Sequence, residues 1–364
     1  MKKKVSQQKL LYRWKRKVYA TLMFAFCFGT FVFIQARFAS IQARFNRISA
    51  SLDSLKKPRL DQRPQIAFLF IARNRLPLEF VWDAFFKGED GKFSIYVHSR
   101  PGFVLNEATT RSKYFLDRQL NDSIQVDWGE STMIEAERVL LRHALRDSFN
   151  HRFVFLSDSC IPLYSFSYTY NYIMSTPTSF VDSFADTKDS RYNPRMNPII
   201  PVRNWRKGSQ WVVLNRKHAE IVVNDTSVFP MFQQHCRPAE GWKEHNCIPD
   251  EHYVQTLLSQ KGVDSELTRR SLTHSAWDLS SSKSNERRGW HPMTYKFSDA
   301  TPDLIQSIKG IDNINYETEY RREWCSSKGK PSPCFLFARK FTRPAALRLL
   351  RETILLEGKE HDNK

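Results

Sequence analysis

The stretch IAFLFIA, Ile66–Ala72, is a continuous apolar run between Pro64 and Arg73. A short uninterrupted run of this kind is typical of a strand that is buried on both faces of a parallel sheet. Helical spacing follows it over residues 76–87, and a second apolar run, FSIYVHS, begins at Phe93. This strand–helix–strand order predicts the start of an α/β fold.

The same alternation continues along the chain. The next predicted elements are a third short strand over residues 124–128, an amphipathic helix over 133–149, and a fourth strand that runs into a polar turn over 152–163. A strand followed by a helix is predicted over 208–225, a last strand over 334–341, and a closing helix over 343–358. The order β-α-β-(β)-α-β predicts an open, mostly parallel sheet flanked by helices.

Polar residues stand at the predicted strand ends, and in open α/β sheets ligands bind beyond the carboxyl ends of the strands. We therefore expect a ligand site at Ala72, Arg73, Asn74, His98, Glu130 and Asp158. The sequence contains neither G-x-G-x-x-G nor G-x-x-x-x-G-K-[ST]. Their absence argues against a dinucleotide-binding Rossmann enzyme and a P-loop NTPase.

The N-terminus has the pattern of a membrane anchor. Residues 1–17 hold eight Lys and Arg and no acid, out of a formal net charge of +18 for the whole chain. Residues 18–36 carry no charge, and a span of about 20 apolar residues is needed to cross a bilayer. The basic flank predicts a cytoplasmic tail followed by a retained type II signal anchor. Cleavage near Ala36 is the alternative.

A helical stem is predicted over residues 37–63. IQARF occurs twice, and from Ile34 to Leu55 large apolar residues recur at alternating intervals of four and three. This is a heptad seam, which favours either a homodimer through the stem or packing on the chain's own domain. The remaining chain is predicted to be a luminal domain over residues 64–356 and a polar tail over 357–364.

The cysteines and sequons agree with a luminal domain. Two sequons start at Asn121 and Asn224, which makes these side chains glycosylation candidates. The close cysteine pairs Cys236 with Cys247 and Cys325 with Cys334 are disulfide candidates in an oxidising compartment. Nucleic-acid binding, the usual interpretation of a basic chain, is not expected in that compartment.

Five blocks carry a resemblance to a known family. FVFLSDSCIPL, WRKGSQWVVLNRKHA, CIPDEHYVQTLL, HPMTY and CFLFARKF occur in this order. The series resembles the core-2/I-branching β-1,6-N-acetylglucosaminyltransferase family, in its plant-type branch, from about Gln65 to about Leu350. The resemblance implies a type II Golgi protein with a GT-A fold. It also implies an inverting, metal-independent transferase that uses a UDP-sugar. The nucleotide and the donor sugar would then occupy the ligand site predicted at the strand ends.

The resemblance assigns a base to the motif Pro249-Asp250-Glu251. An inverting transferase needs a group that deprotonates the acceptor hydroxyl, and a carboxylate on a rigid element does this. In the animal enzymes the Glu of this motif is the base, which implies Glu251. Helix capping explains the same acids without catalysis, and we assign it to Asp250.

Fixed cations are expected in place of a metal, because the sequence contains no D-x-D motif. The resemblance implies Lys340 as one ligand of the UDP diphosphate. The animal arginine has no counterpart between Cys325 and Cys334, so Arg321 and Arg322 are the candidate partners. No metal or other cofactor is expected.

The acceptor side is expected at Gly208, Ser209 and Trp277, and the acceptor at a glycan or glycoprotein. The expected donor sugar is N-acetylglucosamine by resemblance. A membrane-anchored glycan-binding protein with a degenerate transferase fold is the alternative function.

Overall fold

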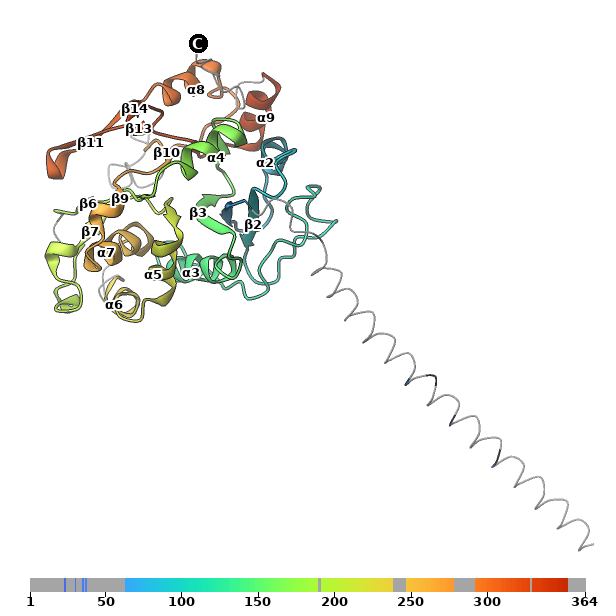
Figure 1. The fold of residues 1–364 in the computed structure, drawn as a ribbon, viewed down its shortest axis with the longest axis horizontal. Helices are drawn as coiled ribbons and strands as arrows, with labels where there is room; N and C mark the ends of the chain where they lie inside the picture. The colour runs from blue at the N-terminus through green and yellow to red at the C-terminus, as the bar shows by residue number, and fades with distance from the viewer. Residues whose placement is uncertain are drawn as a thin grey trace, which may run out of the picture. The chain divides into compact units, whose positions relative to one another are not determined.

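The computed structural model describes residues 63–188, 191–237, 247–277, 292–327 and 329–352, together with Met23, Thr30, Gln35 and Arg37 (Figure 1). The chain divides into two units, residues 1–62 and residues 63–364. The predicted tail, anchor, stem and polar C-terminal segment lie outside the described residues or almost so. In the described part of the chain, no helix has the length and apolar character needed to span a bilayer.

The main sheet has six strands in the order β2-β1-β3-β8-β5-β9. The strands β1, β2 and β3 are parallel to one another, whereas β8 is antiparallel to both β3 and β5. The bounds of the six strands, in sheet order, are Phe93–His98, Gln65–Ile71, Asn150–Ser157, Val213–Asn215, Ser179–Phe180 and Leu267–Thr268. The sheet is therefore mixed, with its parallel part where the sequence predicts it.

A second sheet of three strands has the order β10-β15-β4. Short two-stranded pairs complete the β-structure as β11 with β12, β13 with β14, and β6 with β7. The bounds of these strands, in the order named, are Thr273–Ser275, Phe337–Arg339, Ile161–Pro162, Asn313–Tyr316, Arg321–Trp324, Ser326–Ser327, Lys330–Pro331, Phe184–Ala185 and Arg206–Lys207.

Helices pack on both faces of the main sheet. Their bounds, from α2 to α9, are Glu79–Phe86, Thr132–Ala144, Phe166–Met174, Arg216–Asn224, Val228–His235, Tyr253–Gln260, Pro302–Lys309 and Arg343–Arg351. Short 3-10 turns lie at Pro194–Met196, Val202–Asn204, Pro249–Glu251 (η3), Asp264–Glu266 and Glu317–Glu319 (η6).

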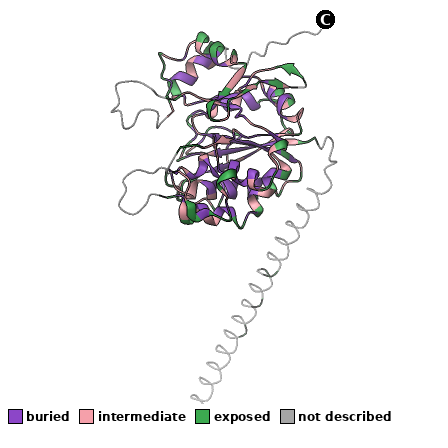
Figure 2. Ribbon diagram, turned by 90° about the vertical axis from the view of Figure 1, so that its left-hand side faces the viewer, coloured by how far each residue is buried: buried purple, intermediate pink, exposed green. Residues whose placement is uncertain are grey.

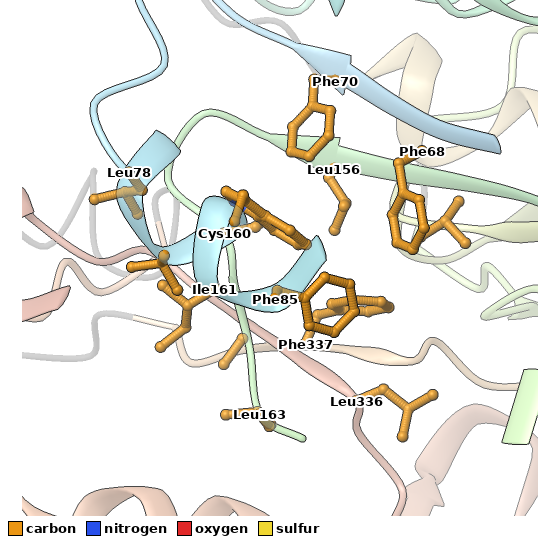
Figure 3. Packing of buried hydrophobic residues seen from close by; sticks show 14 of the residues in the cluster. Phe68, Phe70, Leu78, Phe85, Leu156, Cys160, Ile161, Leu163, Leu336 and Phe337 are labelled. Atoms are coloured by element: carbon orange, nitrogen blue, oxygen red, sulfur yellow. The ribbon is translucent and has the colours of Figure 1, made fainter. Parts of the chain in front are cut away.

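Strand β1 contributes side chains to two hydrophobic cores, because successive side chains point to opposite faces of the sheet. Phe68 and Phe70 belong to the core that includes α2, α4, α9 and β15. Leu69 belongs to the core that includes α3, α5, α6 and α7. Burial is accordingly concentrated at the centre of the domain (Figure 2), and Figure 3 shows Phe85 and Phe337 in the first core with Phe68 and Phe70.

The predicted third strand is wrong. Residues 124–128 form no strand, and the backbone N–H of Ile124 donates to Nε2 of His98 at 3.0 Å. A segment that takes its hydrogen bond from a side chain cannot continue a backbone ladder there. The other strands and helices predicted within the described residues are present, most of them with shorter or shifted bounds.

Both predicted disulfides are confirmed. Cys236 bonds to Cys247 and Cys325 bonds to Cys334, while Cys160 is a buried free thiol. The sequon residues Asn121 and Asn224 are both exposed, and their glycosylation stays a prediction.

Candidate active site

Glu251 lies in a short 3-10 turn, η3, directly before helix α7. Its carboxylate oxygen Oε2 forms an ion pair with Lys207 in strand β7. Its carbonyl oxygen accepts a hydrogen bond from Gly208 N at 2.9 Å. The motif WRKGSQW therefore holds both the backbone and the side chain of the predicted base, a contact that the sequence did not show.

The residue after Glu251 fixes this turn through contacts in the protein interior. His252 is fully buried, and its ring stacks on Trp205 with 4.6 Å between centroids. Nδ1 lies 2.8 Å from the carbonyl oxygen of Ile248, and Nε2 lies 3.1 Å from Asp186. Burial opposes the charge of Asp186, but His252 and Arg191 lower the pKa of that carboxyl to about 2. The start of α7 is thus rigidly placed.

Gly208 occupies a position that admits no side chain. A Cβ there would overlap the backbone carbonyl of Asp182. The Asp182 carboxylate is itself occupied, because Oδ2 accepts from Ser209 N at 3.0 Å and Oδ1 accepts from Tyr316 at 2.5 Å. The predicted acceptor-side pair Gly208-Ser209 is therefore fixed between Glu251 and Asp182.

Asp250 does not cap the helix, contrary to the prediction. Its side chain is buried, and Oδ1 has no hydrogen-bond partner among the described residues. Burial, and then the charge of Glu251, raises the pKa of Asp250 to about 7. Ile248 stands at the N-cap position, without a side-chain cap. Asp250 is therefore an internal carboxyl rather than a helix-start residue.

A second buried acid, Glu137 of helix α3, faces Asp250. Burial first, and the charge of Asp250 second, raise the pKa of Glu137 well above its ordinary value. Gln210 Nε2 donates to Glu137 Oε1 at 3.4 Å. Two desolvated carboxyls that repel each other favour a protonated form at this place.

Cations gather where strand β3 ends. Burial raises the pKa of Asp158, while a hydrogen bond from the Arg73 backbone and the charges of Arg73, Arg339 and Lys340 oppose the rise. Phe341 N donates to the Ser159 carbonyl oxygen at 3.0 Å, which brings the end of β15 against the end of β3. The structure thus joins three predicted residues, Arg73, Asp158 and Lys340, at one edge.

Arg339 is a residue of this site that the sequence reasoning missed. It is 9% exposed, and its guanidinium lies 4.4 Å from the centroid of the Trp211 ring. Burial lowers its pKa, and the charges of Asp158, Asp250 and Glu251 act against that shift. Its place beside Lys340 in CFLFARKF was the available signal. Arg339 therefore lies within electrostatic reach of both Asp158 and Glu251.

The other predicted donor residues line the adjacent strand ends. Ala72 N donates to the carbonyl oxygen of His98 at 2.9 Å. The His98 imidazole is buried, which lowers its pKa and favours the neutral ring. Asn74 Oδ1 is buried without a partner among the described residues. Glu130 lies farther along the chain, where its backbone N–H donates to Asp127 at 3.2 Å.

The arginines predicted to partner Lys340 lie in the β11–β12 hairpin. Arg321 is paired with Glu319 at 3.0 Å and with Glu323 at 2.6 Å. Arg322 Nε donates to Asn315 at 2.9 Å. Both ion pairs of Arg321 are thus with acidic neighbours in the hairpin.

Trp277, predicted on the acceptor side, is 46% exposed.

The arrangement combines a held carboxylate with a cluster of cations at the carboxyl end of a parallel strand. It suits removal of a proton from one substrate and stabilisation of an anionic leaving group on another. The described residues contain no group of three His, Cys, Asp or Glu that could hold a metal ion.

Comparison with known proteins identifies the family. The model of the core-2/I-branching enzyme family matches residues 66–309. The chain belongs to this family. It is also 72% identical over 302 residues to Glycosyltransferase BC10 of Oryza sativa subsp. japonica, across 79% of this chain and 76% of the relative.

The chain is accordingly a glycosyltransferase of the plant branch of the core-2/I-branching family. The mixed α/β domain, with its central sheet between two layers of helices, fits the GT-A-like fold expected from the resemblance. The family match covers the three parallel strands, the Asp158 edge and the turn that carries Glu251.

Proposed function

We propose that this core-2/I-branching enzyme transfers a sugar from a UDP-sugar to a glycan or glycoprotein acceptor with inversion at the anomeric carbon. The observation that carries the proposal is the position of Glu251, whose side chain is held by Lys207 and whose backbone is held by Gly208. Glu251 takes the proton from the acceptor hydroxyl as the hydroxyl oxygen attacks the anomeric carbon.

The leaving group is the UDP diphosphate, and Lys340 and Arg73 bind it. Both cations act on Asp158 at the end of β3, where open α/β sheets bind their ligands. Fixed positive charges stabilise the negative charge that develops on the departing phosphate. Arg73 is a better partner for Lys340 than Arg321, because acidic neighbours already engage Arg321. The mechanism needs no metal ion.

We further propose N-acetylglucosamine as the donor sugar and the Golgi membrane as the location. The support is the family, together with the basic N-terminus and the uncharged segment that follows it. The catalytic domain then faces the lumen, where the two disulfides are stable.

A donor panel tests the proposal. The purified full-length chain is incubated with a series of UDP-sugars and EDTA, and both hydrolysis and transfer are measured. Turnover of UDP-N-acetylglucosamine in EDTA is the expected result. Activity that EDTA abolishes contradicts the metal-free mechanism. Binding of glycans without turnover of any donor favours the glycan-binding alternative.

A further inference from the structure

The β11–β12 hairpin presents two different faces. In its antiparallel register Tyr316 pairs with Arg321, and Asn315 pairs with Arg322. Directly paired residues of an antiparallel ladder point to the same face. Tyr316 and Arg321 therefore share the inner face, and Asn315, Arg322 and Trp324 share the outer face. The turn η6, which connects the two strands of the hairpin, contacts β6, and the hairpin lies at one edge of the domain (Figure 1).

The inner face fixes the hairpin to the acceptor side of the site. The buried Tyr316 donates to Asp182, which in turn accepts from Ser209 N. In the connecting turn η6, Glu319 Oε1 accepts from Ala185 N at 3.0 Å and from Arg269 at 2.5 Å. The disulfide at Cys325 follows the second strand directly. The hairpin is thus a rigid extension of the segment that holds Glu251.

The outer face is aromatic, polar and open. Trp324 is 60% exposed, and Tyr320, in the turn that connects the two strands, is 100% exposed. The Arg322 guanidinium lies 5.5 Å from the centroid of the Trp324 ring, and its Nε is hydrogen-bonded to Asn315. Arg322 and Trp324 are therefore held in one arrangement before any ligand arrives, which lowers the entropy cost of binding.

Tyr320 adds a second, independent observation. Its φ is 50°, in the left-handed region. A bulky residue there is costly, by about 1 kcal/mol or more, and a fully exposed ring gains no packing energy in return. Glycine would be the relaxed choice at this turn. An aromatic ring at this strained and fully exposed position points to a function outside folding.

We propose that the outer face of the hairpin, formed by Asn315, Arg322 and Trp324, binds together with Tyr320 of the connecting turn the glycan chain of the acceptor, beyond the sugar that reacts. Exposed Trp and Tyr rings offer large rigid surfaces with a polar tip, and amide and guanidinium groups donate to hydroxyls. This inference rests on the proposed function, because continuity with Ser209 and Glu251 selects an acceptor glycan as the ligand.

Binding by the full-length chain tests the inference directly. The probe is an array of glycans that ranges from monosaccharides to longer chains. We expect Trp324→Ala to weaken binding of the longer chains about tenfold, with monosaccharide binding unchanged. Tyr320→Gly relieves the backbone and should raise the melting temperature while it also weakens glycan binding. A purely structural role for Tyr320 predicts no loss of binding.

Phe297→Ala is the matched control. Phe297 is 58% exposed, and the Arg348 guanidinium lies 5.2 Å from the centroid of its ring. The substitution therefore removes a similar aromatic–arginine pair at another place on the surface. Equal glycan binding by wild type and Trp324→Ala, or an equal loss with Phe297→Ala, overturns the inference. So does a Trp324-dependent loss of binding to phosphatidylserine vesicles without any change in glycan binding.

Failure of the proposed function would look different. If glycan binding depends on Trp324 but the chain turns over no UDP-sugar, the proposed glycan-binding surface is supported and the proposed transferase mechanism is contradicted. If Trp324→Ala transfers sugar with an unchanged KM for long acceptors, only the proposed glycan-binding surface is contradicted.

Discussion

Lys207 and Glu251 form an ion pair in which the side chains are 19% and 23% exposed. At this burial the pair is screened less than a surface salt bridge, and it fixes one oxygen of the carboxylate. The contact joins two of the sequence blocks that resemble the family, the one that carries the proposed base and the one that contains WRKGSQW.

Glu251→Gln should lower turnover by about 10²–10⁴-fold, because an amide cannot accept the acceptor proton. UDP binding should hardly change, since the diphosphate site is built from other residues. Steady-state transfer and UDP titration by calorimetry measure the two effects. Normal turnover in this variant would remove Glu251 as the base.

Lys207→Met should lower kcat by roughly tenfold, through loss of carboxylate orientation, while UDP affinity is retained. Lys207→Arg should restore part of the rate. Lys217→Met is the control, because Lys217 pairs with Glu266 at 2.6 Å on an exposed surface. Equal kinetic effects of Lys207→Met and Lys217→Met would show that the partly buried Lys207–Glu251 pair has no special role.

Lys340→Ala and Arg73→Ala should each weaken UDP binding about tenfold or more, with a loss that shrinks as ionic strength rises. Calorimetric titrations with UDP in low and high salt give this comparison. Arg322→Ala separates the two assignments of the arginine partner. If it weakens UDP binding as much as Arg73→Ala does, the arginine predicted from the sequence is the correct one.

Much of the fold was predictable from local pattern. The runs around Phe68 and Val154 are apolar without interruption, and their short length and bounding residues favour a strand that is buried on both faces. Cysteine spacing predicted both bonds. The strand predicted over residues 124–128 is wrong although apolar and polar residues do alternate there, because the run is short. His98, which lies far from it in sequence, accepts the hydrogen bond of the Ile124 backbone N–H.

The site was less predictable because its contacts connect distant segments. Glu251, Lys340 and Arg73 were within reach of motif and strand-end arguments. Lys207 was not, since only the folded chain brings it to Glu251. Arg339 was missed although it stands beside Lys340 in CFLFARKF, because its proximity to Asp158 appears only in the folded chain. Asp250 was misassigned because an acid at a helix start is normally a cap, and burial changes its chemistry.

Gly208→Ala should lower both the melting temperature and turnover, because the added Cβ displaces the Asp182 carbonyl and with it the backbone contact to Glu251. Gly310→Ala is the control, since its Cβ would lie 3.2 Å from the carbonyl oxygen of Gln306 in its own helix end. Thermal unfolding and initial rates compare the two. An unchanged Gly208→Ala enzyme would contradict the close approach.

Asp250→Asn should change how stability depends on pH. The folded-state pKa of Asp250 is raised to about 7 from an ordinary value of 3.8. Between these values the unfolded chain binds fewer protons at this group than the folded chain. The free energy of unfolding therefore falls as pH rises through that window, and the loss is complete above about pH 7.

The asparagine variant lacks this proton equilibrium, so its melting temperature should exceed that of the wild type at pH 7.5 and approach it near pH 4. Thermal unfolding of the full-length chain across this range measures the crossing. Asp90→Asn, at an exposed loop residue, should shift both ends of the range equally. A pH slope in Asp250→Asn as steep as that of the wild type would place the titrating carboxyl elsewhere, with Glu137→Gln as the next variant to measure.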